Sequence, residues 1–194
     1  MAVRIAKVED VPRILEIYAP YVEKTAYTFE YTVPMMEEFT ERFQNITKQF
    51  PWLVWEEEGC VKGYAYASLP FSRPGYRWCC EVSIYLAPET QRKGVGKSLY
   101  AVLEHILWQQ GYRTIYSVVT GTNTGSVEFH KKVGYEIFAT FPKCGYKLGR
   151  NLDVIWLQKQ SNAVEMPTEF PVPWTAIVEN DEKLTDILAI LSLS

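Results

Sequence analysis

Residues 83–99 read SIYLAPETQRKGVGKSL, and this stretch indicates a strand, a basic turn and the start of a helix. The apolar and β-branched run up to Leu86 is typical of a strand, and Pro88 ends it because proline has no backbone N–H to donate. From Val95 onward, apolar residues recur at helical spacing until Gly111, which predicts a helix packed on one face. Glycines in the turn let a ligand approach the backbone, and the first N–H groups of a helix can bind an anion. The stretch therefore predicts a phosphate-binding turn.

Three phosphate-binding motifs compete for this turn, and their spacing separates them. The ending GKS at residues 96–98 imitates a Walker A loop, but that loop needs a glycine at the position of Gln91. A dinucleotide-binding fingerprint that starts at Gly94 needs its third glycine where Leu99 stands. The remaining pattern, Gln91-x-x-Gly94-x-Gly96 after a strand, resembles the pyrophosphate loop of the GNAT N-acetyltransferase superfamily, which holds acetyl-coenzyme A. A basic turn that only caps a helix stays open as the alternative.

The composition favours a small-molecule partner. A chain of 194 residues with 47% hydrophobic residues can bury a sizeable core and form one domain with an appendage. The net charge of −3, without a block of like charge, argues against a nucleic-acid-binding protein. No apolar run approaches the about 20 residues of a membrane span, and the first residues lead into a strand pattern rather than a signal peptide. We therefore expect a cytoplasmic protein that binds neither nucleic acid nor membrane.

The cysteines and histidines argue against a metal site. The four cysteines lack metal-ligand spacing, and two of them, Cys79 and Cys80, are adjacent, which favours reduced thiols over a disulfide framework. Only His105 and His130 are available as histidines, so zinc catalysis is not expected.

Hydrophobic patterns along the chain predict the element order βααβββαβαββ. The expected strands cover residues 3–6, 52–55, 61–67, 78–86, 114–120, 135–141 and 154–157. The expected helices cover residues 11–22, 35–48, 94–110 and 126–133. A glycine-rich loop is expected at residues 143–150, between the last two strands. This order predicts an α/β fold with a mixed sheet covered by helices on both faces.

The composition changes after Gln160. We predict a domain over residues 1–160, followed by a proline-containing linker and an amphipathic C-terminal helix within residues 161–194. This helix is expected to begin near Asn180 or Asp181. Because such a helix needs a surface to cover, we expect it to dock on its own domain, with a partner subunit as the alternative.

Longer segments make the resemblance more specific. Residues 81–96, the run NTGSVEFHKKVGY at 123–135 and the run GYKLGRNLDV at 145–154 resemble the phosphinothricin and methionine sulfoximine acetyltransferase branch of the GNAT superfamily. The resemblance covers about residues 3–160 and implies a GNAT-type mixed sheet, an acetyl-coenzyme A-dependent transferase and a homodimer. It implies acetylation of the amine of a small amino acid or analogue. Acetylation of a protein N-terminus or a polyamine stays open, as does a catalytically silent coenzyme A-binding regulator.

The resemblance implies two catalytic residues. The family places a glutamate at the position of Glu81, where it can accept the proton of the substrate ammonium. A charge between Cys80 and Val82 in an apolar strand also needs a specific reason. His130 stands seven residues after Asn123, where the superfamily commonly has a tyrosine that meets the coenzyme sulfur. An imidazolium at this point, or a water beside it, could protonate the departing thiolate; a histidine on a helix surface is the alternative.

The binding residues follow from the same resemblance. The expected coenzyme-binding residues are Ile84, Tyr85, Leu86, Gln91, Arg92, Lys93, Gly94, Val95, Gly96, Lys97, Ser98, Asn123 and Ser126. The expected substrate-binding residues are Phe29, Arg73, Glu81 and Tyr85. The backbone N–H groups of Tyr85 and Leu86 are candidates for polarising the thioester carbonyl. Phe71 stands where members specialised for phosphinothricin can carry a lysine, which argues against phosphinothricin itself but not against another amino acid.

Overall fold

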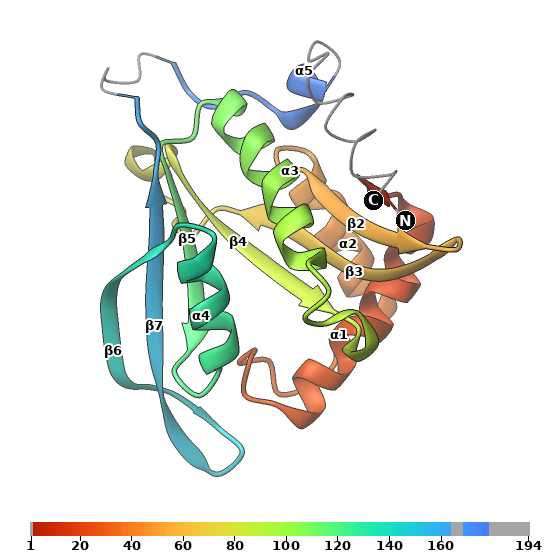
Figure 1. The fold of residues 1–194 in the computed structure, drawn as a ribbon, viewed down its shortest axis with the longest axis vertical. Coiled ribbons are helices and arrows are strands. Elements are labelled where there is room, and N and C mark those ends of the chain that lie inside the picture. The colour runs from red at the N-terminus through yellow and green to blue at the C-terminus, as the bar shows by residue number, and fades with distance from the viewer. Residues whose placement is uncertain (1, 164–168, 179–194) are drawn as a thin grey trace.

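The computed structural model describes residues 2–163 and 169–178, which form a seven-stranded mixed sheet in the order β1-β2-β3-β4-β5-β7-β6 (Figure 1). All neighbouring strands are antiparallel except β4 and β5. The strands are β1 (Ala2–Ile5), β2 (Trp52–Glu57), β3 (Cys60–Ser68), β4 (Cys79–Leu86), β5 (Thr114–Thr120), β6 (Glu136–Lys147) and β7 (Arg150–Gln160).

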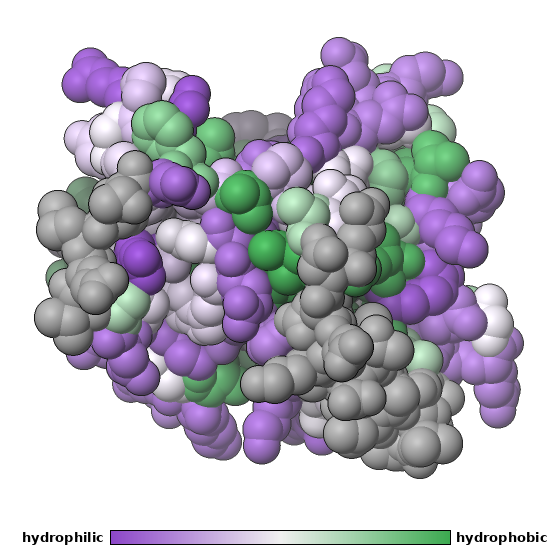
Figure 2. Space-filling view, turned by 90° about the horizontal axis from the view of Figure 1, so that it is seen from above, coloured by the Kyte–Doolittle hydropathy of each residue, from purple (hydrophilic) through white to green (hydrophobic). Residues whose placement is uncertain are grey.

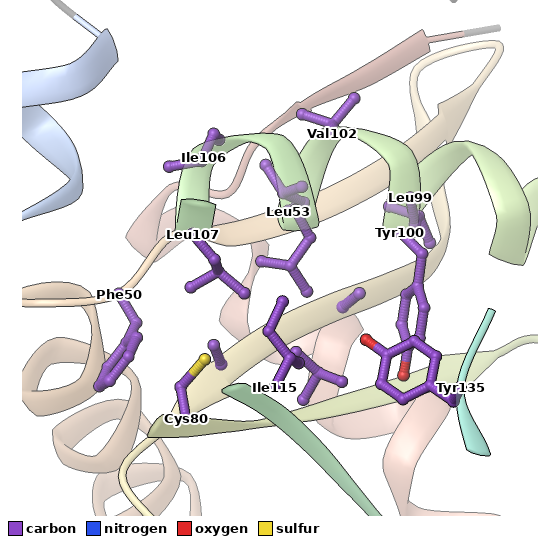
Figure 3. Packing of buried hydrophobic residues seen from close by; sticks show 14 of the residues in the cluster. Phe50, Leu53, Cys80, Leu99, Tyr100, Val102, Ile106, Leu107, Ile115 and Tyr135 are labelled. Atoms are coloured by element: carbon purple, nitrogen blue, oxygen red, sulfur yellow. The ribbon is translucent and has the colours of Figure 1, made fainter. Parts of the chain in front are cut away.

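Helices cover the sheet on both faces. They are α1 (Val11–Lys24), α2 (Met36–Thr47), α3 (Val95–Gln110), α4 (Thr124–Lys132) and α5 (Trp174–Val178). Successive side chains of a strand point to opposite faces, so Trp52 packs with α1 and α2 whereas Leu53 packs with α3. Figure 3 shows Leu107 of α3 beside Leu53 and above Ile115, in the larger of the two cores. The expected α/β fold and element order are confirmed.

The sheet opens between its two halves. β4 and β5 pair only from Cys79 and Thr114 to Glu81 and Tyr116. Beyond that point β4 continues along β3, and β5 continues along β7. In Figure 1 the free ends of β4 and β5 accordingly diverge. The divergence leaves an opening in the middle of the sheet.

The last two strands are longer than the sequence predicts. β6 runs to Lys147 and β7 starts at Arg150, so the expected loop over residues 143–150 is wrong. A tight turn with positive φ at Leu148 and Gly149 joins the strands. Gly145 is a packing requirement rather than a loop signal, because a Cβ on it would overlap the ring of Phe29.

The segment after β7 packs back on the domain. The indole N–H of Trp174 donates to the Thr47 carbonyl over 2.7 Å, and the Gln110 amide donates to the Val172 carbonyl over 2.7 Å. α5 thus lies in the stretch expected to be a linker. Figure 2 looks onto this end of the molecule and shows hydrophobic patches between hydrophilic residues. The helix expected near residue 181 lies outside the described residues, and the domain division at residue 160 stays a prediction.

Candidate active site

A cavity of about 60 Å³ lies between the diverging ends of β4 and β5. Ser83 of β4 and Ser117 of β5 line it within the sheet. Tyr21, on α1, borders it from one face, whereas Tyr100 and His130, on α3 and α4, border it from the other. The cavity therefore passes through the sheet, so that groups on opposite faces can meet in it. A larger, more open depression of about 690 Å³ near Trp108 and Gln160 is lined by none of the predicted site residues.

The basic turn after β4 has the backbone geometry of an anion site. Arg92 and Gly94 have positive φ angles of 63° and 85°. The first intrahelical bond of α3 runs from the Ser98 N–H to the Gly94 carbonyl over 3.1 Å, so the three N–H groups before Ser98 precede the helix ladder. Gly96 brings α3 close to α4, because a Cβ on it would lie 3.2 Å from the ring of Phe129. These N–H groups, with the exposed cations of the turn, can hold phosphate.

The strand end before the turn presents one N–H to the opening at Leu86. The Ala87 N–H donates to Lys62 of β3, and successive N–H groups of a strand point to opposite sides. The Leu86 N–H therefore points away from β3, where the Tyr21 hydroxyl lies 3.4 Å from it. The Tyr85 N–H points toward β3. Of the two N–H groups that we expected to polarise a carbonyl, only that of Leu86 has the required direction.

Glu81 lies where β4 and β5 part. Its carboxylate has no hydrogen bond or ion pair with any described residue. Burial raises the pKa of the Glu81 carboxyl to about 7, because a carboxylate away from water loses hydration. At neutral pH the group can therefore exist in both protonation states, as a general base requires.

His130 is buried in a polar cluster. Its Nδ1 lies 2.7 Å from the Ser126 carbonyl oxygen, which can only accept, so Nδ1 carries the proton. Its Nε2 lies 2.9 Å from the Tyr100 hydroxyl and 2.8 Å from the Ser117 hydroxyl. Burial lowers the pKa of His130 to about 4. The structure therefore argues against the expected imidazolium at neutral pH and against the alternative of an exposed histidine.

Asn123 and Ser126 have local structural roles at the start of α4. The Asn123 side chain accepts the Ser126 N–H over 3.2 Å and caps the helix. Both residues also line the cavity. Their contact with the coenzyme stays a prediction.

Of the four expected substrate residues, Glu81 and Tyr85 lie on β4, and Phe29 and Arg73 lie on two loops. Phe29 packs against Gly145 of β6, and the Lys147 ammonium donates to the Thr28 carbonyl over 2.8 Å, which fastens this loop to the β6–β7 hairpin. Arg73 is exposed on the loop between β3 and β4. No described contact joins Arg73 to Glu81, so their cooperation stays a prediction.

Sequence reasoning did not name eight of the residues that line the cavity, namely Tyr21, Tyr27, Val82, Ser83, Tyr100, Ser117, Val118 and Val119. One signal was available for Ser117, a polar residue on the strand face that also carries Ile115 and Val119.

Comparisons with known proteins show the family of this chain. A model of the acetyltransferase (GNAT) domain matches residues 3–156. The chain is 31% identical over 157 residues to phosphinothricin N-acetyltransferase of Streptomyces viridochromogenes, covering 81% of this chain and 86% of that protein. It is 32% identical over 161 residues to L-methionine sulfoximine/L-methionine sulfone acetyltransferase of Salmonella typhimurium, covering 82% and 94%. The crystal structure of a phosphinothricin acetyltransferase from Sinorhizobium meliloti in complex with AcCoA is similar with a TM-score of 0.83 and 36% identity, covering 89% of this chain and 96% of that one.

Proposed function

This chain belongs to the GNAT acetyltransferase family, and on that premise we propose that it acetylates the amine of a small amino acid or amino-acid analogue, with acetyl-coenzyme A as co-substrate. One observation carries the proposal: β4 and β5 part at Glu81, which puts a carboxylate of raised pKa at the start of the gap between them, next to Val82 and Ser83, which line the cavity. The names of the Streptomyces viridochromogenes and Salmonella typhimurium relatives support the substrate class.

The residues present fit acetyl-coenzyme A. The turn between β4 and α3 offers N–H groups and exposed cations for phosphates, and the narrow cavity beside it suits an extended chain. The residues that would hold the coenzyme are those of the turn at 91–98, the strand end at 84–86, and Asn123 with Ser126. When bound, acetyl-coenzyme A supplies an acetyl group activated as a thioester.

Glu81 is the proposed general base. It takes the proton that the substrate nitrogen loses as the new N–C bond replaces the C–S bond, either directly or through water. The Leu86 N–H stabilises the negative charge that develops on the oxygen of the thioester carbonyl. Its contact with the Tyr21 hydroxyl is long, at 3.4 Å, and therefore weak enough to be replaced by a hydrogen bond to that oxygen.

His130 is proposed to act through its hydroxyl neighbours. A neutral ring with its proton on Nδ1 offers Nε2 as an acceptor to Tyr100 and Ser117. This arrangement holds both hydroxyls at the cavity, so a hydroxyl or a water beside them would deliver the proton to the departing sulfur. The proposal does not include a proton donated to the sulfur directly by a protonated His130 ring.

We also propose a homodimer that acts in the cytoplasm. β6 is an edge strand that leaves Ile137 exposed, and such an edge is suited to cover by another subunit. Dependence on acetyl-coenzyme A, a metabolite of the cell interior, supports the location. In the described part of the chain, no helix is long and apolar enough to cross a bilayer.

The experiment is a screen of amino acids and analogues with the purified chain and acetyl-coenzyme A, with release of the free thiol as the readout. Acetylation of at least one small amino acid, lost in Glu81→Gln while coenzyme binding persists, is the expected result. Coenzyme binding without acetylation of any amine would leave the silent regulator as the better account.

A further inference from the structure

A group of aromatic rings lies on the sheet beside Glu81. We call it the aromatic cluster, and its members are Phe71, Tyr76, Tyr116, Phe138, Phe141 and Trp156. The rings of Phe71 and Trp156 are nearly parallel, at 10°, with centroids 6.0 Å apart. Phe71 also contacts Tyr76, with centroids 4.8 Å apart, and Tyr116 contacts Phe138 at 5.4 Å. The rings thus form one continuous surface.

The aromatic cluster shares a face of the sheet with Glu81. Tyr116 is the register partner of Glu81, so the two side chains point to the same side. Trp156 lies opposite Val118, two residues further along β5, and has the same orientation. α1 and α2 cover this face only over the first half of the sheet, and Phe71 and Phe138 remain 39% and 45% exposed. Exposed aromatic rings that gather next to a candidate catalytic residue, here Glu81, are typical of a binding site.

A guanidinium lies within the same loop. Phe71 and Tyr76 contact each other and bracket Arg73, whose side chain is exposed. Within the described residues Arg73 makes no ion pair, whereas its neighbour Arg77 lies over the ring of Phe170 at 4.8 Å. Arg73 is therefore available to a carboxylate beside the rings.

We propose that the preferred acceptor is an aromatic α-amino acid, whose ring packs on the aromatic cluster while its amine faces Glu81 and its carboxylate pairs with Arg73. This inference rests on the proposed function and adds the side-chain class to it. An added ring gains both apolar burial and the ring–ring geometry that aliphatic side chains lack.

The test compares phenylalanine and tryptophan with leucine, alanine, glutamate and phosphinothricin as acceptors for the full chain. Phenethylamine serves as an aromatic amine without a carboxylate. We expect the kcat/KM for phenylalanine to exceed that for leucine by about tenfold. Phe71→Leu, which keeps apolar volume but removes the ring, should lower kcat/KM for phenylalanine about 3- to 10-fold and leave that for alanine nearly unchanged.

Phe170→Leu is the matched control, since it removes an exposed ring outside the aromatic cluster and should leave the ratio unchanged. Arg73→Gln should reduce turnover of phenylalanine much more than that of phenethylamine. Acetylation of small amino acids without an aromatic preference, or a preference that persists in Phe71→Leu, would overturn the inference and leave the proposed function intact. A change in solution mass of Phe71→Leu with unchanged specificity would assign the aromatic cluster to a subunit contact instead. Failure to acetylate any amine would overturn the proposed function as well.

Discussion

Glu81 and Tyr116 form the last residue pair that joins β4 to β5, and the sheet opens directly beyond them. The strand that carries the proposed base is therefore also the strand whose free end leads to the basic turn at residues 91–98. β3 and β7 continue to pair with β4 and β5, which keeps the opening rigid on both sides. In the proposed function, the coenzyme would approach from the α3 side and the amine from the Glu81 side.

The pH dependence of activity should report Glu81. Because burial raises the pKa of Glu81 to about 7 and the base must be ionised, kcat/KM should rise with pH and level off above about 8. A profile of kcat/KM from pH 5 to 9 checks this. If kcat/KM instead reaches its maximum below pH 6, the base has an ordinary carboxyl pKa.

Glu81→Gln should remove a loss of stability that Glu81 causes as pH rises. A carboxyl with a raised folded pKa binds more protons when folded, so its contribution to the free energy of unfolding falls as pH rises from about 4.5 to 7. Glu81→Gln should therefore be more stable than the wild type at pH 8, by up to about 3 kcal/mol, and nearly equal at pH 4.5. Urea unfolding at the two pH values measures the difference. Equal gains at both pH values would contradict the assignment.

His130 should stay neutral over the working range of the protein. Its folded pKa of about 4 lies below the unfolded value, so the stability it contributes is present above about pH 6.5 and is lost as pH falls toward 4. NMR of the imidazole should show no titration between pH 8 and 5.5. A midpoint near 6.5 would instead restore the imidazolium as a proton donor.

Gly96 should not tolerate a methyl group. A Cβ there would lie 3.2 Å from Phe129 and 3.3 Å from Ile84, so Gly96→Ala should destabilise the fold by about 1–3 kcal/mol and weaken coenzyme binding. Gly125→Ala is the control, because a Cβ there meets nothing within 4 Å and alanine favours a helix. Thermal unfolding and calorimetric titration of coenzyme A measure both effects. Equal destabilisation in the two variants would contradict the packing argument.

The chain truncated after residue 160 should fold but lose stability. Truncation removes the hydrogen bonds that Gln110 and Trp174 make across this boundary, each worth about 1 kcal/mol. We expect a cooperative transition with a free energy of unfolding lower by at least about 2 kcal/mol. A truncated chain without a cooperative transition would contradict the domain division.

Local patterns predicted most elements because a periodic run of apolar residues lies between residues that end helices or strands. α3 is an example, since its apolar residues recur at helical spacing between Gly94 and Gly111. Local patterns failed in the second half of β6, where most side chains are exposed, so no alternation marks the strand, and Gly145 serves the packing of Phe29. They also failed at α5, where prolines in the sequence conceal a short helix held by distant residues such as Thr47.

The candidate site was predictable only in part, for a similar reason. An isolated charge in an apolar strand singles out Glu81, and glycine spacing singles out the turn. The ionisation of His130 depends on its burial, and the two hydroxyls at its Nε2, those of Tyr100 and Ser117, are 30 and 13 residues away in the sequence. No local pattern encodes such contacts, so neither hydroxyl was predicted.

The central claim, that Glu81 is the base of an amine acetyltransferase, is tested most directly by Glu81→Gln. We expect kcat/KM for the best amino-acid substrate to fall about 10²- to 10⁴-fold, with the dissociation constant of coenzyme A unchanged. Unchanged turnover in Glu81→Gln, with the coenzyme still bound, would contradict the account.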